Sequence, residues 1–551
     1  MTDTTAPKDS EVVDGRERDV IAGSAGRWVD DRLNVSKFAD SVLSHVFPDN
    51  WTFLLGEIAM YCFTILLFTG VYLTFFFHPG TNQVVYSGSY VPLRGVPMSE
   101  AYESTVRLSF DVRAGLVVRQ IHHWTADIFA AAIVAHLCRI FFTGAFRRPR
   151  EINWLIGVTM LILVIFNGFA GYSLPDDLLS ATGLRIAYSI LLSVPFIGTW
   201  LASLFFGGQY PGPSTIDRLF IIHVLILPVL IATLLAGHLA IIWRQKHSQF
   251  PARGRTEHNV VGLRLWPTYA AKSAGLFAIV FALSAALGGL AQINPIWLYG
   301  PYRTGAVTTA AQPDWYMGWL EGALRVFPAW RVHIFHHTIP EVFWPGVVLP
   351  ALTFALLFAW PFLEARVTHD HAEHHLLDRP RFRPVRTCIG TGVLAFYVVL
   401  FAAGSQDIFA QHLNAPIPTV DRTFRILLLV APIVTAAITW KWCHDLARES
   451  VRKAETPPAP WPPPPHGAEA LDAALSSQGD DSDALQPVAT PAAAPALEPS
   501  RSAELVALFS TAAAIVRDLR GWRRARKARK HARSGATRSD VAERPLEDAP
   551  P

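Results

Sequence analysis

Long apolar stretches alternate with polar segments along most of the chain. Stretches such as 221–235 are apolar on all sides of a helix, and they lack the alternation of apolar and polar residues that is typical of membrane β-strands. A helix of about 20 apolar residues crosses the hydrocarbon core of a bilayer and satisfies its own backbone hydrogen bonds there. The pattern therefore predicts eight transmembrane helices, at 51–77, 115–142, 152–174, 217–243, 270–291, 343–363, 387–403 and 423–443.

The composition supports an all-α membrane protein. Hydrophobic residues make up 51% of the 551 residues and charged residues only 17%, with 17 Trp and 34 Phe. We therefore expect a polytopic membrane helix bundle rather than several soluble domains. The four cysteines are scattered and no CxxCH motif is present, so the sequence indicates neither a covalently bound haem nor a zinc or disulfide framework.

Basic residues gather in the loops after the second and fourth spans and before the seventh. They are Arg139, Arg147, Arg148 and Arg150, then Arg244, Lys246, Arg253 and Arg255, then Arg379, Arg381, Arg383 and Arg386. Because cytoplasmic loops carry an excess of lysine and arginine, we expect these loops and both termini on the cytoplasmic side of the cell membrane. Asp176 and Asp177, which follow the third span, then lie on the outer side.

Polar segments flank the predicted bundle. Residues 1–50 lack the apolar region of a secretory signal and are expected to form a cytoplasmic lead. Residues 446–551 begin with a Pro- and Ala-rich composition typical of disorder, and continue through an amphipathic stretch at 504–519 to a basic block at 520–533. Anionic membrane lipid is the partner expected for this block, with a solvated tail as the alternative, and we expect no nucleic-acid binding.

Four histidines lie inside the second and fourth spans, where polar groups are costly and are therefore candidates for function. His122 and His136 are fourteen residues apart, which places them about 40° apart in direction and about 21 Å apart along a helix. His223 and His238 are fifteen residues apart, about 60° in direction and about 22 Å in height. A lone histidine of this kind would be expected to hydrogen-bond within the bundle, but four at matched depths predict two axial pairs for haem iron. His123 points away from the face of His136 and is not expected to be a ligand.

Two glycine pairs repeat the histidine interval. Gly56 and Gly70 on the first span are fourteen residues apart, and so are Gly157 and Gly171 on the third. A glycine lets a flat macrocycle approach the helix backbone, in a volume that any side chain would fill. Close packing of helices through small residues is the alternative explanation, but it gives no reason for the shared interval.

Two arginines lie next to the histidines. Arg119 is one turn before His122, and Arg139 is three residues after His136. Because arginine binds carboxylates well, each is a candidate partner for a haem propionate. Arg139 is equally explained as an ordinary arginine at the cytoplasmic end of a span.

These residues resemble the cytochrome b of bc1 and b6f complexes. The stretches "VVRQIHHW", "FFTGAFRRPREINW" and "NGFAGYSLP" resemble the second and third helices of the b6 branch, and the histidine spacing is similar to that branch as well. The stretch "QPDWYMGW" at 312–319 resembles the PEWY motif of the quinol site, with Asp in place of Glu. The fusion of both halves in one chain and the long polar tail resemble the actinobacterial, menaquinol-oxidising version.

The resemblance implies a division of the chain and a reaction. Residues 51–265 would form a four-helix dihaem core, and 266–445 a second four-helix half similar to subunit IV, carrying the PDWY loop. Quinol, which the resemblance implies to be menaquinol, would be oxidised at the outer face with a Rieske iron–sulfur partner. The enzyme would be a quinol:cytochrome c oxidoreductase that translocates protons by a Q-cycle. The implied partners are the Rieske protein, a cytochrome c subunit, a second copy of the complex and a terminal oxidase in a supercomplex.

The same resemblance assigns the sites. Electrons would pass through two non-covalent haems b with bis-histidine ligation, the outer one held by His122 and His223 and the inner one by His136 and His238. The implied outer quinol site comprises Tyr172, Pro313, Asp314, Trp315 and Tyr316. The inner quinone site is assigned to Glu57, Arg244 and Lys272. Asp314 is expected to accept a quinol proton, with capping of the helix that follows it as an alternative or additional role.

Besides the Asp of PDWY, the chain departs from the family pattern at three places. Asp176 and Asp177 replace a pair that begins with Trp, which changes the expected start of an outer helix. Ser273 stands where mitochondrial forms have an inner-site Asp, so we expect Glu57 to deliver a proton there instead, with a carboxylate that only reaches the lipid headgroups or water as the alternative. The b6 branch fixes an extra haem to a cysteine two residues before the first glycine, and this chain has Leu54 at that position.

Two other classes of membrane protein share part of this pattern. A dihaem membrane subunit of a formate dehydrogenase or hydrogenase also uses paired histidines, but has no need of PDWY and the glycine interval together. A transporter usually shows internal repeats or broken helices, and none is evident in the sequence. Histidines also cluster in two polar loops, at 369–375 and 333–337, and we expect both clusters to lie at a solvated surface. Metal binding or proton gathering is the alternative for the first cluster, and contact with the Rieske partner for the second.

Overall fold

The computed structural model describes residues 24–308, 312–334 and 337–455. The chain divides into two units, Met1–Ser450 and Val451–Pro551. The amphipathic stretch and the basic block predicted at 504–533 lie outside the described residues, as does His336. Both predicted halves of the membrane region, 51–265 and 266–445, belong to the first unit.

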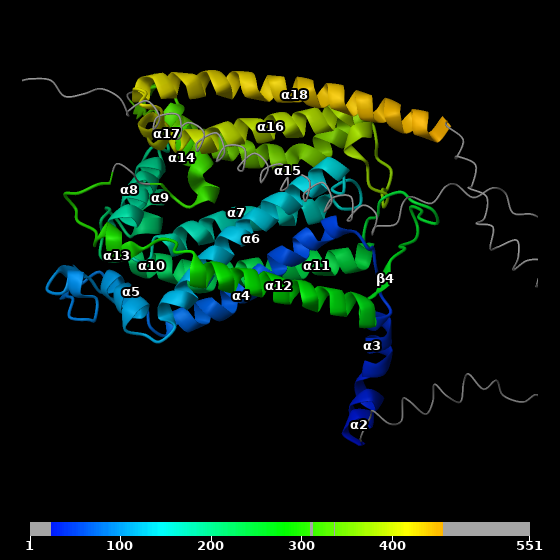
Figure 1. Ribbon diagram of the computed structural model, residues 1–551, viewed down its shortest axis with the longest axis horizontal. Helices are drawn as coiled ribbons and strands as arrows, with labels where there is room; N and C mark the ends of the chain where they lie inside the picture. Colours follow the sequence, from blue (N-terminus) through cyan, green and yellow to red (C-terminus); the bar gives the residue numbers. More distant parts are fainter. Residues whose placement is uncertain (1–23, 309–311, 335–336, 456–551) are drawn as a thin grey trace, which may run out of the picture. The chain divides into compact units, whose positions relative to one another are not determined.

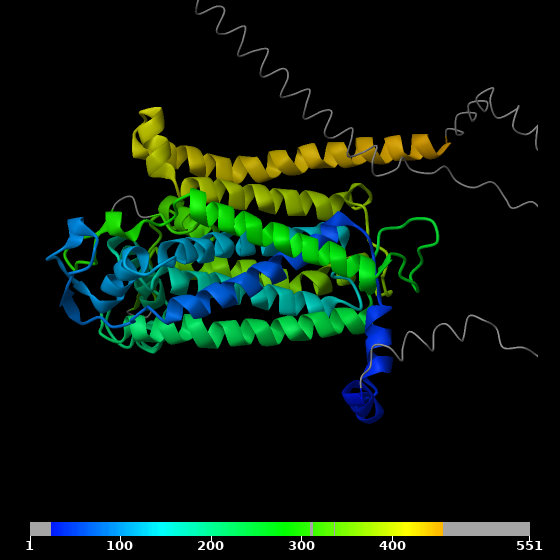
Figure 2. The ribbon, with the colours of Figure 1, turned by 60° about the horizontal axis from the view of Figure 1, so that its bottom comes forward.

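Within the described residues, eight helical segments are long and apolar enough to cross a membrane, which confirms the predicted number of spans and the all-α polytopic bundle. They run side by side in the first unit (Figures 1 and 2). The segments are Trp51–Thr74, Gly115–Thr143, Glu151–Tyr172, Thr215–Gln245, Leu265–Leu290, Trp344–Thr368, Pro384–Ala403 and Ile417–Ser450.

The spans are built from α-helices with short 3-10 or π segments at some of their starts and, in the fourth span, between two α-helices. In chain order these are η1 (Trp51–Phe53) with α4 (Leu54–Thr74), α6 (Gly115–Thr143), α7 (Glu151–Tyr172), α10 (Thr215–Ile221) with η3 (Ile222–Ile226) and α11 (Leu227–Gln245), η4 (Leu265–Tyr269) with α12 (Ala270–Leu290), η6 (Trp344–Val348) with α15 (Leu349–Thr368), α16 (Pro384–Ala403) and α18 (Ile417–Glu455).

Shorter elements lie before and between the spans. They are α2 (Ser24–Leu33), α3 (Val35–Leu43), η2 (Val91–Leu93), α5 (Glu100–Phe110), α8 (Leu178–Leu192), α9 (Gly198–Phe206), α13 (Ile296–Tyr299), η5 (Trp315–Met317), α14 (Gly318–Val326), η7 (Pro380–Phe382) and α17 (Gln406–Leu413). Three antiparallel strand pairs complete the described fold: β1 (Val46–Phe47) with β4 (Leu263–Arg264), β2 (Gln83–Val85) with β3 (Pro97–Ser99), and β5 (Val332–Ile334) with β6 (His337–Ile339).

The last span is longer than predicted. Hydropathy places it at 423–443, but α18 continues to Glu455, so the expected domain boundary at residue 445 falls inside a continuous helix. Hydropathy reports where a helix is apolar, whereas charged residues that favour helix, such as those of 445–455, can extend it beyond the bilayer.

The first four spans enclose a common apolar core. One buried cluster joins Phe63 of α4, Phe129 of α6, Val164 of α7 and Ile231 of α11, and α12 adds Val280. Helix α4 packs on α6 and α7 packs on α11, while α12 covers α4 and α6. The cluster therefore lies at the centre of a four-helix arrangement, between the two ends at which the histidines lie.

The helix after the third span begins at an aspartate. The Asp177 side chain accepts hydrogen bonds from the backbone N–H groups of Leu179 (3.0 Å) and Ser180 (3.2 Å), and Asp177 is almost completely buried. Asp176 adopts a left-handed conformation with φ +55°. An aspartate is a good N-cap, so this departure from the family pattern still starts a helix, α8.

Candidate haem and quinone sites

His122 and His223 face each other from α6 and η3. Their ring centroids are 6.2 Å apart. Two imidazoles bonded to one metal ion from opposite sides, with bonds of about 2 Å, have ring centres roughly 6 Å apart. The observed separation therefore fits an iron atom between the two rings.

Hydrogen bonds fix the Nδ1 atom of each of these rings. Thr69 Oγ1 lies 2.8 Å from His122 Nδ1, and because this hydroxyl already donates to a backbone carbonyl it acts here as the acceptor. His223 Nδ1 lies 2.9 Å from the backbone oxygen of Asn167. Such bonds hold the ring proton on Nδ1 and leave Nε2 free to bind a metal.

A π-helical turn explains the unequal histidine intervals. In η3 the N–H of Leu227 bonds to the carbonyl of Ile222, five residues back, and the next residue is Pro228, which has no N–H. A π turn takes up one residue more than an α turn. Fifteen residues from His223 to His238 therefore cover nearly the same rotation as fourteen in a regular helix, which brings the two closer to one face than the predicted 60°.

His136 of α6 and His238 of α11 line a second cavity at the other end of the bundle. Its volume is about 340 Å³, and that of the cavity at His122 and His223 is about 280 Å³. His136 Nδ1 is enclosed and has no hydrogen-bond partner among the described residues. Phe63, Phe129 and Val164 of the central cluster line both cavities, so one apolar layer separates the two histidine pairs.

Each of the four predicted glycines lies against one of the four histidine rings. A Cβ atom added at Gly56 would lie 3.1 Å from His136, one at Gly70 3.3 Å from His122, and one at Gly157 3.9 Å from His238. A Cβ atom at Gly171 would overlap the ring of His223. The glycines therefore let the imidazole rings lie close to the helix backbone and leave space beside them.

Both predicted arginines line these cavities. Arg119 Nη2 donates to the backbone oxygen of Asn294 (3.0 Å), but its Nε is enclosed without a partner. Arg139 lies over the ring of Phe53 at 4.2 Å, and both its Nε and its Nη2 are enclosed without partners among the described residues. Buried guanidinium donors without acceptors are costly, and the carboxylates of a haem are the acceptors that fit them.

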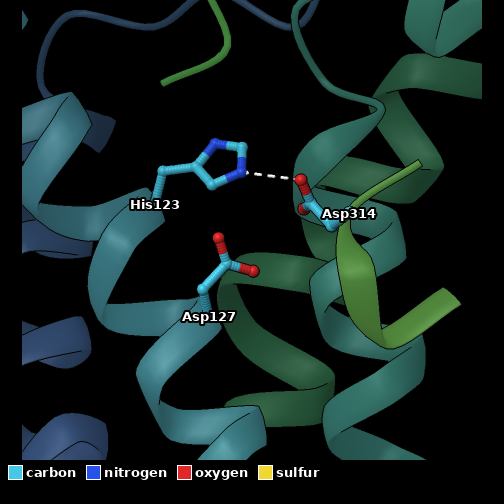
Figure 3. Close-up of side chains that lie close together, drawn as sticks. All are labelled: His123, Asp127 and Asp314. Atoms are coloured by element: carbon cyan, nitrogen blue, oxygen red, sulfur yellow. Dashed lines mark hydrogen bonds and ion pairs between the residues drawn. The ribbon is translucent and has the colours of Figure 1, made fainter. Parts of the chain in front are cut away.

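Asp314 forms the centre of a polar cluster beside the first cavity. Its Oδ1 is 2.8 Å from His123 Nε2 (Figure 3), and its Oδ2 accepts a hydrogen bond of 3.0 Å from the hydroxyl of Tyr316. Although Asp314 occupies the position before η5, its side chain makes no capping bond, so the alternative capping role is not seen. Burial, and then the nearby Asp314, raise the pKa of Tyr316 well above its usual value, so its hydroxyl stays a donor.

The other expected outer residues surround this cluster. Tyr172 lines the first cavity, and its hydroxyl is enclosed without a partner among the described residues. Trp315 packs edge-on against Tyr316 with ring centroids 6.2 Å apart. Pro313 precedes Asp314 in the loop and is half-buried, but it does not line the cavity.

The sequence did not single out two members of the cluster, His123 and Asp127. His123 points away from the histidine pair, as its position predicts, but there it meets Asp314, 191 residues later in the chain. Asp127 follows one turn later on α6, and its carboxylate lies beside the same imidazole (Figure 3). The available signal was two polar side chains one turn apart in an apolar span. Gly168 was also missed, and a Cβ atom there would lie 2.5 Å from the hydroxyl of Tyr316.

Glu57 lies at the centre of a hydrogen-bonded group at the other cavity. Its carboxylate accepts hydrogen bonds from the hydroxyl groups of Tyr269, Ser273 (2.8 Å) and Tyr61 (3.4 Å). Glu57, Tyr269 and Ser273 all line the cavity that contains His136 and His238.

The two other residues assigned to this site lie apart from the cavity. Lys272 forms an ion pair with Asp49, and Arg244 is exposed. Neither lines the cavity. The sequence also did not assign His247 to this cavity wall. His247 follows the end of α11, and its burial lowers its pKa to about 4, so that it is neutral at pH 7.

Three histidines of the polar loops make polar contacts with residues near them. His374 Nε2 lies 2.9 Å from Asp370 Oδ1, and His375 Nδ1 lies 3.0 Å from Arg150. His333 Nδ1 lies 3.0 Å from Thr338 Oγ1 in the β5–β6 hairpin. In the part of the chain that the structure describes, the one close group of three potential metal-binding side chains is that of His123, Asp127 and Asp314.

Comparison with known proteins gives consistent matches. The family model described as "Cytochrome b(N-terminal)/b6/petB" matches residues 127–301. A cytochrome bc1 complex cytochrome b subunit of Mycobacterium leprae is 52% identical over 431 residues, which is 78% of each chain. The protein of the same description from Streptomyces coelicolor is 48% identical over 430 residues, or 77% of this chain and 78% of that one.

A solved structure shares the fold. It is described as a hyperthermophilic respiratory Complex III, and the superposition has a TM-score of 0.56 at 20% sequence identity. It covers 75% of this chain and 98% of the other.

Proposed function

The chain belongs to the family of bc1 complex cytochrome b subunits, and from this premise we propose that it oxidises quinol at the Asp314 cluster and passes electrons through two haems b to a quinone. The family makes it a haem-binding, multi-pass subunit of a quinol:cytochrome c oxidoreductase, whose partners are a Rieske protein and a cytochrome c subunit. The observation that carries the proposal is the pairing of four in-span histidines at two cavities, with a carboxylate cluster beside one of them.

Each histidine pair would hold one haem without a covalent bond. His122 and His223 would bind the first iron through their Nε2 atoms, with Arg119 facing a propionate. His136 and His238 would bind the second, with Arg139 in the same role. When bound, each haem supplies a carrier for one electron. The protein contributes the imidazole rings, those of His122 and His223 held by hydrogen bonds, the glycines that leave space beside them, and the layer of Phe63, Phe129 and Val164 that keeps water out between the two cavities.

Asp314 would act as a base at the first cavity. Oxidation of a quinol releases two protons and two electrons, and a base at the hydroxyl typically raises the rate about 10²–10⁴-fold. Asp314 offers a carboxylate held by His123 and by the hydroxyl of Tyr316, at the edge of a cavity that Tyr172 and Tyr316 also line. The Rieske partner would take one electron and one proton, and Asp314 the other proton.

Glu57 would deliver a proton at the second cavity. Reduction of a quinone there takes up two protons, and Glu57 is connected through hydrogen bonds to Tyr269 and Ser273 in the wall of the same cavity. This fits the sequence expectation that Ser273 cannot donate a carboxyl proton and that another group must. Arg244 and Lys272 would act through the electrostatic field at this end rather than by contact.

The orientation and surroundings follow from the loop charges and the family. The Asp314 cluster would face the outside of the plasma membrane, with Glu57 and both termini at the cytoplasmic side, so that a Q-cycle releases protons outside and takes them up inside. Menaquinol is the proposed substrate. The complex would be a dimer that associates with a terminal oxidase, and the basic block of the tail would meet anionic lipid.

The assembled complex with Asp314→Asn tests the outer site. The amide keeps the size of the side chain but cannot accept a proton, so we expect quinol:cytochrome c reductase activity to fall at least about 100-fold while both b-haem bands remain. The control variant is Asp217→Asn, which changes an exposed carboxylate near the same end of the bundle. Glu364→Gln would not serve as a control, because it breaks a buried ion pair. Wild-type rates across pH in Asp314→Asn would refute the assignment of the base.

A further inference from the structure

The two histidines of the second span differ in what their Nδ1 atoms meet. Thr69 Oγ1 lies 2.8 Å from His122 Nδ1 and donates its own proton to the backbone oxygen of Ile65 (2.7 Å), so it accepts the Nδ1–H group of the ring. At the other level, His136 Nδ1 is enclosed and has no hydrogen-bond partner within the described part of the chain. One imidazole of this span therefore donates a hydrogen bond to a hydroxyl group, and the other does not.

The position of Thr69 on the first span explains this difference. Leu55 stands fourteen residues before Thr69, and the two histidines of the second span are also fourteen residues apart. A right-handed helix turns the same way when it is followed in either direction, so fourteen residues carry both spans through the same rotation and rise. A Cβ atom added at the glycine after Thr69 would lie 3.3 Å from His122, and one added at the glycine after Leu55 would lie 3.1 Å from His136. Leu55 therefore has the same relation to its ring as Thr69 has, but its side chain contains no acceptor.

The histidines of the fourth span face the same kind of acceptor at both levels. His223 Nδ1 forms a hydrogen bond of 2.9 Å with the backbone oxygen of Asn167. His238 Nδ1 faces the backbone oxygen of Asn153, fourteen residues earlier on α7, but lies outside hydrogen-bonding geometry. A backbone oxygen is thus present at each level, and the hydroxyl of Thr69 is the acceptor side chain that one level has and the other lacks.

We propose that Thr69 is a positioning residue that lowers the reduction potential of the haem held by His122 and His223. A hydrogen bond from Nδ1–H makes a metal-binding imidazole more basic, and a more basic ligand stabilises ferric iron more than ferrous iron. Thr69 acts through the ring of His122 and forms no bond to the iron. Leu55 leaves the ring of His136 without this effect.

The inference rests on the proposed binding of two haems and adds a cause for a difference between them. An electron is held less firmly at the level that contains Thr69, so it passes more readily to the level that contains Leu55. One hydrogen bond changes an equilibrium constant by up to about tenfold, and a tenfold change in a one-electron equilibrium corresponds to about 59 mV.

The test is a redox titration of the assembled complex, followed by the absorbance of each b-haem band. Thr69→Val keeps a side chain of similar shape without the hydroxyl, Thr69→Ser keeps the hydroxyl, and Leu55→Thr supplies one at the other level. Thr64→Val is the matched control, because it makes the same change on the same helix. The hydroxyl of Thr64 donates to the backbone oxygen of Met60 (3.0 Å), and Thr64 lines neither cavity.

We expect the variants to shift one haem at a time and in opposite directions. Thr69→Val changes the equilibrium between ferric and ferrous iron about three- to tenfold and raises the midpoint potential of the haem at His122 by roughly 28–59 mV. Leu55→Thr lowers the midpoint potential of the haem at His136 by a similar amount. Thr69→Ser and Thr64→Val keep the potentials of the unmodified complex.

Two results would overturn the inference. The first is unchanged potentials in Thr69→Val and Leu55→Thr while both b-haem bands are present, and the second is an equal shift in Thr69→Val and Thr64→Val. If Thr69→Val does not assemble, Leu55→Thr decides the question, because it leaves Thr69 in place and predicts a shift at the other haem. An unmodified complex without b-haem bands would instead contradict the proposed function.

Discussion

Replacing Gly171 by alanine is the sharpest test of the histidine and glycine arrangement. The added Cβ atom would lie 2.8 Å from both Nδ1 and Nε2 of His223. Non-bonded carbon and nitrogen atoms prefer separations of about 3.5–4.0 Å, so the overlap amounts to roughly 0.7 Å or more at two ring atoms. The imidazole must move, and it moves away from the position in which it faces His122.

The four glycines form a graded series with an internal control. At Gly157 the added Cβ atom would be 3.9 Å from His238, an ordinary contact, while Gly56 and Gly70 give 3.1 and 3.3 Å. Overpacking in a tight site costs about 1–3 kcal/mol. Since 1.4 kcal/mol is a factor of ten in affinity, Gly171→Ala should weaken retention of the haem at His122 and His223 about 5- to 150-fold.

Haem transfer to excess apomyoglobin measures this loss directly in the purified complex. We expect Gly171→Ala to release one of its two haems faster by that factor and to keep the other, with Gly157→Ala close to the unmodified protein. Optical difference spectra identify which b-haem band is lost. Equal release rates in Gly171→Ala and Gly157→Ala would show that contact between the glycines and the imidazoles does not control haem binding.

Three further predictions concern the same sites. His136→Ala should abolish one b-haem band while His123→Ala keeps both, as judged by optical difference spectra; loss of a band in His123→Ala would contradict the assigned ligands. The denatured polypeptide should not stain for haem, because Leu54 stands where the b6 branch has a cysteine, and a stained band would refute this. Glu57→Gln should slow re-oxidation of the His136/His238 haem by quinone about tenfold or more, because general acid–base groups contribute at least that much. Stopped-flow absorbance would record this step, and an unchanged rate would dismiss Glu57 as a proton donor.

The sequence alone determined the features that repeat along a single helix. Eight apolar runs predicted the spans. A segment in lipid must pair all its backbone polar groups within a helix, and this requirement leaves a strong signal in the composition of the sequence. The histidine and glycine intervals predicted two levels in the bundle, because helical rotation is regular enough to count over fourteen residues. Both kinds of information are local, and neither requires knowledge of which helices touch.

Tertiary structure decided everything that depends on contacts between helices. The sequence around His123 is the same whether or not Asp314 lies opposite it, and the two residues are 191 positions apart in the chain. The contact between them therefore cannot be predicted from the helix alone. The π turn at η3 arises where Pro228 removes a backbone donor, and hydropathy does not register it. The hydrogen bonds of Glu57 to Tyr269 and Ser273 likewise join the first span to the fifth. Apolar side chains fix how deep a helix lies in the membrane, but the rotation of each helix is set by packing against its neighbours, and that rotation selects which polar groups meet.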